Sequence, residues 1–117
     1  MRLNEAVYTD ATPIEGYGPG FFRISGQVFE GAIVALPTGV APWGGYDDAQ
    51  TLLDAAGALD VFFVGTGAEI AHLPADLRTT LEDAGVGVEV MSSPTACRTY
   101  NIMLSEGRRV GLALLPV

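Results

Sequence analysis

The residues best suited to chemistry gather near the carboxyl end of the chain. Cys97, Arg98 and Tyr100 share one short segment that apolar spacing predicts to be helical. A thiol near a helix N-terminus and beside an arginine can ionise, because both neighbours favour the thiolate. The arginine guanidinium can also donate two parallel hydrogen bonds to a carboxylate or a phosphate. We therefore take Cys97, Arg98 and Tyr100 as candidate ligand-binding residues. Because a lone cysteine is usually a small buried side chain, we predict that alkylating reagents reach Cys97 slowly in the native state, and a reactive thiol is the alternative.

A second candidate element is Gly65-Thr66-Gly67, which follows the apolar run Val61–Val64. In open α/β sheets, ligands bind beyond the carboxyl ends of strands, where glycines let amides approach an anion and threonine donates a hydrogen bond. The third glycine of a dinucleotide fingerprint is replaced by Ile70, and no P-loop is present. The two readings are therefore a small-anion site and a tight structural turn.

Positive charge is scarce in this chain. Six Lys+Arg stand against 14 Asp+Glu, which gives a net charge of −8. Three of the cations, Arg98, Arg108 and Arg109, lie near Glu106, where they either form internal ion pairs or contact a ligand or partner. The overall charge repels phosphate backbones and anionic membranes, so we expect no nucleic-acid partner.

The sequence gives little support for metal binding, for a cofactor or for a catalytic nucleophile. One cysteine and one histidine, His72, provide no metal-ligand spacing, so we assign no metal, no cofactor and no catalytic residue. A nucleophile elbow and a Cys–His pair within one segment are also missing. No apolar run has the roughly 18–20 residues of a membrane span, and the N-terminus is unlike a secretory signal. We expect a cytoplasmic protein that does not insert into the membrane.

Aromatic residues in glycine-rich stretches suggest a contact surface. Phe21 and Phe22 follow a run of glycines, and Trp43 stands between Pro42 and Gly44. Such side chains either cover the edge of the core or anchor a partner. We predict Phe21, Phe22 and Trp43 as partner-binding residues, for an unidentified protein or a second copy of the chain.

Apolar patterning predicts strands first and then alternating helices and strands, which indicates one α/β domain over residues 1–117. Turn residues punctuate the pattern, and Ser25-Gly26 is typical of a hairpin. The expected elements are an irregular arm over 1–20 with a short strand at Ala6–Thr9, strands at 21–24, 27–30 and 32–36, a helix capped by Asp47 or Asp48, a buried strand at 61–64, a helix through Leu77 and Leu81 that ends at Gly85, a strand at 86–90, a helix capped by Ser93 that runs to Ser105, and a strand at 110–115.

Several of these segments together resemble the Mth938-like family, also called the domain-of-unknown-function 498 family. The resemblance spans nearly the whole chain and is carried by Gly16-Tyr17-Gly18, Gly20-Phe21-Phe22-Arg23-Ile24, Gly31, Trp43, Val64-Gly65-Thr66-Gly67, Val88-Glu89-Val90-Met91, Ala96-Cys97-Arg98-Thr99-Tyr100-Asn101 and Glu106-Gly107-Arg108-Arg109-Val110. One departure is Ser92-Ser93, where the family usually has Asp-Thr. The resemblance implies a three-layer α/β fold with a central mixed sheet, flanking helices and an additional β portion from the N-terminal half.

The resemblance also implies a family without an established enzymatic activity, one mitochondrial branch of which assembles respiratory complex I. That branch carries an added transit segment, whereas this chain starts at the domain, so a bacterial source is expected. Our first functional hypothesis is a non-enzymatic interaction module for a membrane or respiratory complex. The second is a protein or enzyme that binds a small anion through Gly65-Thr66-Gly67 and Arg98, and a weaker third is a thiol sensor at Cys97.

A geometric expectation links the two candidate segments. If strands 61–64 and 86–91 are parallel neighbours, the turn at 65–67 and the start of the following helix emerge at the same edge of the sheet. We therefore expect these segments to lie together and to line the main concave surface.

Overall fold

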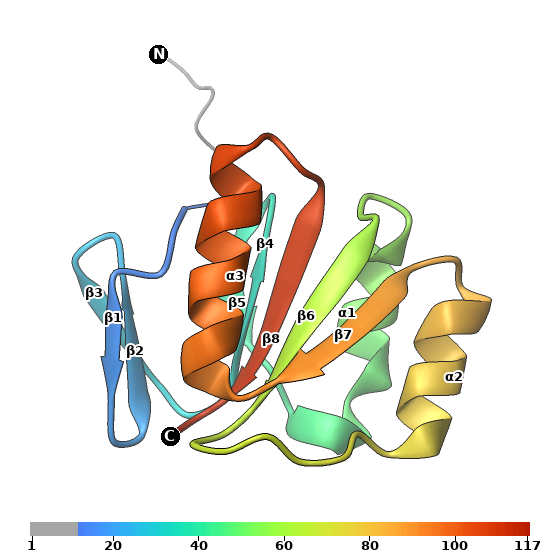
Figure 1. Ribbon diagram of the computed structural model, residues 1–117, viewed down its shortest axis with the longest axis horizontal. Coiled ribbons are helices and arrows are strands. Elements are labelled where there is room, and N and C mark those ends of the chain that lie inside the picture. Colours follow the sequence, from blue (N-terminus) through green and yellow to red (C-terminus); the bar gives the residue numbers. More distant parts are fainter. Residues whose placement is uncertain (1–11) are drawn as a thin grey trace.

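The computed structural model describes residues 12–117, so the strand expected at Ala6–Thr9 lies outside the described residues. Three layers make up the fold (Figure 1). The elements are β1 (Gly16–Gly18), β2 (Phe21–Ile24), β3 (Gln27–Glu30), β4 (Ile33–Leu36), β5 (Gly39–Pro42), the single-turn helix η1 (Gly45–Asp47), α1 (Ala49–Ala56), β6 (Val61–Thr66), α2 (Ala75–Asp83), β7 (Gly87–Met91), α3 (Ser93–Ser105) and β8 (Val110–Leu115).

The middle layer is a five-stranded mixed sheet with the order β5-β4-β8-β6-β7. β6 pairs in parallel with both β8 and β7, whereas β4 pairs antiparallel with β8 and β5. The near-continuous apolar runs of β4, β6 and β8 arise because these strands are covered on both faces. The α/β alternation read from the sequence is confirmed, and so is the mixed central sheet.

Each face of this sheet has its own hydrophobic core. Side chains alternate along each strand, so Phe63 and Leu112 face α3, whereas Phe62 and Val64 face α1 and α2. Figure 1 shows α3 on one face and the other two helices on the opposite face. The extra β portion shares the α3 side and completes the first core.

That extra portion is a three-stranded antiparallel sheet with the order β1-β2-β3. Phe22 and Ile24 are fully buried on its inner face and join the core beneath α3. The predicted hairpin at Ser25-Gly26 is confirmed, since both residues have positive φ (52° and 75°), as a type I′ turn requires.

Two strands were missed in the sequence. β1 lies within the stretch that was expected to be an irregular arm, and β5 lies between the strand expected at 32–36 and the helix expected from Asp47 or Asp48, where no strand was expected. Both are short, and β5 ends in a proline, which an edge strand tolerates because its outward N–H needs no partner. Their pairing therefore depends on neighbouring strands more than on local pattern.

Candidate functional site

The carboxyl ends of β6 and β7 lie side by side, as the parallel pairing predicts. Gly65 and Thr66 are the last two residues of β6, so the strand continues further than expected. The Thr66 hydroxyl donates to the carbonyl of Glu69 (2.8 Å) and contacts that of Met91 (3.3 Å). It also accepts from the amide of Ala71 (3.0 Å). The threonine thus ties the end of β6 to β7 and to the loop that follows.

The start of α3 differs from the sequence expectation by one residue. Ser92 is the N-cap and accepts from the amide of Thr95, whereas Ser93 is fully buried. The Ser93 hydroxyl accepts from the amide of Gly67 (2.9 Å) and donates to the carbonyl of Leu115 (2.6 Å). One serine therefore joins the end of β6, the start of α3 and the end of β8.

Gly65 makes this junction sterically feasible. A Cβ atom at this position would lie 2.7 Å from the Ser93 hydroxyl oxygen and from Cδ2 of Leu114, and 2.8 Å from Cα of Ser93. Real side chains do not approach so closely, so only glycine lets α3 start this near the strand. The close approach of the two candidate segments is confirmed, and it is filled by protein atoms.

The remaining candidates on α3 do not converge on one point. Cys97 and Tyr100 are buried in the core, whereas Arg98 is exposed and donates to the Thr95 hydroxyl (3.2 Å). Burial raises the pKa of Cys97 to about 12, against a smaller opposing effect of Arg98. Burial also raises the pKa of Tyr100 to about 12. Both groups are therefore neutral at physiological pH.

Two further residues of this segment support the fold. The Asn101 side chain accepts from the amide of Ile14 (2.9 Å) and donates to its carbonyl (2.9 Å), which fastens the N-terminal stretch to α3. Arg109 pairs with Asp60 at 2.7 Å, and its hydrogen bond lowers the pKa of that carboxyl. Internal pairing, one of the two alternatives considered for the arginines, is thus observed for Arg109.

Two of the expected contact aromatics are not on the surface. Phe22 is fully buried beneath α3, and Trp43 is only 4% exposed. The Trp43 indole N–H donates to the carbonyl of Asp48 (3.0 Å), which permits burial of the whole ring. Of the two alternatives considered for these aromatics, a place in the core is observed for Phe22 and Trp43, which corrects their prediction as partner-binding residues.

Phe21 is half-buried, and its ring lies over Gly18 of the neighbouring strand. We define the outer face of the small sheet by Phe21, Arg23, Val28 and Glu30, which pair across β2 and β3 on the side away from α3. Val28 is 50% exposed there. Tyr17 is 45% exposed but pairs with the buried Phe22, so it lies on the opposite face of the small sheet. Of the two apolar residues on this face, the sequence predicted Phe21 as a contact residue and gave no signal for Val28.

Surface hollows lie elsewhere. Three of about 260–270 Å³ are formed by described residues, and none of these three includes residues 65–67, Cys97, Arg98 or Tyr100. Hydrogen bonds and core packing fill the junction itself. That those residues line the main concave surface stays a prediction. Within residues 12–117, no group of three or more His, Cys, Asp and Glu side chains could hold a metal ion.

Within residues 12–117, no helix is both long enough and apolar enough to cross a membrane.

Fold and site together define a three-layer α/β domain with an additional antiparallel sheet, in which the polar-rich segment of α3 serves mainly to hold the layers together. Residues 14–115 match the family described as a protein of unknown function, DUF498/DUF598. The chain belongs to this family. A Bordetella pertussis protein described as a Mth938-like domain has the same fold, with a TM-score of 0.76 and 33% identity over 99% of this chain and 92% of that one.

Two sequence relatives and one further structure extend the comparison. An uncharacterised Rhodobacter capsulatus protein is 50% identical over all of this chain and 94% of its own length. The zebrafish NADH dehydrogenase [ubiquinone] 1 alpha subcomplex assembly factor 3 is 33% identical over 90% of this chain. This chain spans 64% of that factor's length. A Bartonella henselae structure described as an outer membrane protein has a TM-score of 0.83 and 31% identity, over 92% of this chain and 96% of that one.

Proposed function

We propose that this protein is a non-enzymatic interaction module that helps to assemble a respiratory membrane complex. The observation that carries the proposal is its similarity, over nine-tenths of the chain, to a relative named as a complex I assembly factor. We place the module in the cytoplasm. Its net charge of −8 disfavours direct attachment to an anionic bilayer, so it should reach the membrane complex through protein contacts.

The arrangement of the candidate site supports contact with a protein over binding of a small anion. The Thr66 hydroxyl and the Gly67 amide, which the anion hypothesis requires, both have partners inside the fold. Arg98 points to solvent, and Cys97 is buried. A bound anion would have to displace hydrogen bonds that join three elements, which costs about 1–3 kcal/mol for each buried group left unpaired.

The partner surface that we propose is the outer face of the small sheet. Phe21 and Val28 provide apolar contact area, and Arg23 and Glu30 add charges of both signs around it. Half-exposed apolar side chains bordered by charge are typical of a protein contact. Self-association through the same face is the alternative.

Affinity capture with a tagged protein tests this proposal. Wild type, Val28→Glu and Ile102→Glu are expressed in Rhodobacter capsulatus, and captured proteins are identified by mass spectrometry. Ile102 is a matched control, because it is 55% exposed but belongs to α3 and not to the small sheet. Wild type and Ile102→Glu should capture subunits of the respiratory NADH dehydrogenase, and Val28→Glu should lose most of them.

The possible results distinguish the assembly role of the protein from the location of its contact surface. Equal capture by all three proteins would place the contact elsewhere on the molecule. Capture of no respiratory subunit by wild type would contradict the assembly role itself.

A further inference from the structure

The free edge of the large sheet offers a second surface of defined chemistry. β7 is the last strand in the order β5-β4-β8-β6-β7, and within residues 12–117 no further strand pairs with its outer side. An unpaired edge carries a row of backbone donors and acceptors that can bind another strand. The direction of each backbone group on β7 decides what this edge can bind.

Two internal contacts fix those directions. The amide of Gly87 donates to the carbonyl of Asp60, just before β6, and the carbonyl of Met91 accepts from Thr66 at the end of β6. Because alternate residues of a strand point to opposite sides, Val88 and Val90 direct their N–H and C=O groups outward. Among the described residues, only the Val88 carbonyl of these four groups has a partner, Arg78.

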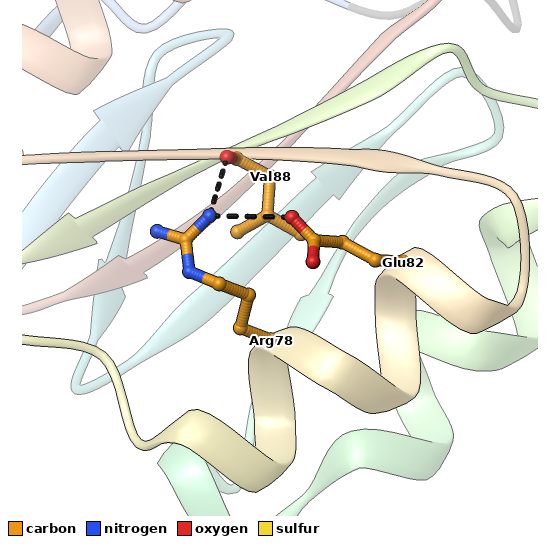
Figure 2. Close-up of polar contacts among 3 residues, drawn as sticks. All are labelled: Arg78, Glu82 and Val88. Carbon is orange, nitrogen blue, oxygen red and sulfur yellow. Dashed lines mark hydrogen bonds and ion pairs between the residues drawn. The ribbon is translucent and has the colours of Figure 1, made fainter.

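Arg78 reaches from α2 to that carbonyl across the edge (Figure 2). Its guanidinium lies 3.2 Å from the Val88 oxygen and 3.4 Å from a Glu82 oxygen. A charged side chain in this place protects one half of the edge against unspecific strand pairing. The half around Val90 is left open.

A hollow of about 270 Å³ adjoins this open half. Its lining residues are Ile70, Ala71, His72, Leu73, Arg78 and Val90. Ile70 is 67% exposed, the largest exposed fraction among the large apolar side chains described. The hollow is smaller than the roughly 300–1,000 Å³ of a typical small-molecule pocket and suits a single side chain.

Because side chains alternate between the two faces of a sheet, the surroundings of β7 indicate which residue types a partner strand would carry at successive positions. A residue placed opposite Val90 would share its face of the sheet and enter the hollow. The adjacent residue would point to the other face, beside the exposed carboxylate of Glu89. A basic side chain at that position is therefore complementary to Glu89.

We propose that the outer edge of β7 binds an extended segment of a partner protein in which apolar and basic residues alternate. Its backbone pairs with Val88 and Val90, displacing Arg78 from the Val88 carbonyl. One apolar side chain fills the hollow, and the neighbouring basic side chain lies beside Glu89. This surface is distinct from the outer face of the small sheet and does not depend on the assembly role.

A peptide titration followed by NMR tests the inference at about 0.15 M salt. The probe is a capped synthetic peptide of about six residues, a typical strand length, in which leucine alternates with lysine. Its control carries glutamate in place of lysine. The lysine peptide should shift the amide signals of β7 and slow hydrogen exchange at Val88 and Val90 by about tenfold or more, because their outward N–H groups become paired.

Substitutions in the protein test whether the peptide binds at the hollow beside β7. Ile70→Ser should weaken the lysine peptide about fivefold or more by removing an apolar wall of the hollow without adding charge, whereas Ile102→Ser should leave its affinity unchanged. The inference is overturned if both peptides bind equally, if the shifts map to β1–β3, or if β7 becomes protected without peptide as protein concentration rises. The last result would indicate pairing of two copies of the chain.

Discussion

At the scale of single residues, the side chains that first suggested chemistry are those that the fold buries. Cys97 and Tyr100 lie on the same side of α3 and contribute to the core beneath the small sheet. The Tyr100 hydroxyl is a buried polar atom without a hydrogen-bond partner among the described residues. The raised pKa of each group follows from burial, which disfavours the charged form, and is no sign of activation.

The thiol of Cys97 should make stability depend on pH. Its pKa is about 12 in the folded protein against an ordinary value of 9.0, so the folded state retains a proton that the unfolded state releases. The contribution of this group to the free energy of unfolding should therefore be constant below about pH 9 and fall above it, by about 1.4 kcal/mol per pH unit. Urea unfolding at pH 8, 9 and 10 measures this slope.

Cys97→Ala is the control for that measurement. The variant is less stable at every pH, because it loses buried atoms. Its loss of stability between pH 9 and 10 should nevertheless be smaller than that of wild type. Identical slopes in the two proteins would show that the thiol is accessible in the folded state.

The unpartnered hydroxyl of Tyr100 gives a second prediction. Tyr100→Phe removes a buried polar atom that makes no hydrogen bond, so the free energy of unfolding should rise by about 1 kcal/mol. Urea unfolding near pH 7 measures this change. A loss of more than about 1 kcal/mol would mean that the hydroxyl has a partner in solution.

At the scale of elements, the decisive feature is the junction of β6, α3 and β8. Ser93 links all three, and Gly65 provides the space in which the serine lies. The closeness of β6 and α3 followed from parallel pairing and could be predicted. The hydrogen bonds could not, because they depend on where α3 begins to within one residue and on the end of β8, far along the chain.

Two glycine substitutions test this junction. Gly65→Ala should destabilise the protein by about 1–3 kcal/mol, since the new methyl group would overlap Ser93 and Leu114. Gly57→Ala is its matched control, because Gly57 has helical φ of −66° and open space at the Cβ position. The control should gain about 0.4–1 kcal/mol through reduced freedom of the unfolded chain.

Thermal unfolding of both variants measures the difference. Equal stability of the two would mean that α3 shifts away from β6 at little cost. In that case the tight junction would not be essential to the fold.

The elements also show which structural features apolar patterning in the sequence could predict and which it could not. Continuous apolar runs identified β6 and β8, because strands buried on both faces require them. Asp48 was recognised as one of two candidate caps of α1, and it accepts from the Thr51 amide. The burial of Trp43 was missed, because proline and glycine neighbours indicate a loop but do not say that the indole turns inward.

At the scale of the whole molecule, a single sheet carries two cores, and two kinds of surface are left for partners. The outer face of the small sheet presents half-exposed apolar side chains, and the edge of β7 presents backbone groups beside a hollow. Family membership could be predicted from local motifs. These surfaces could not, because each combines segments that only the folded chain brings together.

The central claim is that this module promotes assembly of a respiratory complex. The most direct test deletes the gene of the 50% identical relative in Rhodobacter capsulatus and supplies this chain from a plasmid. The amount of assembled NADH dehydrogenase in membranes is then measured by native gel electrophoresis with activity staining. Our account predicts loss of the assembled complex in the deletion strain and recovery with this chain, and an undiminished amount in the deletion strain would contradict it.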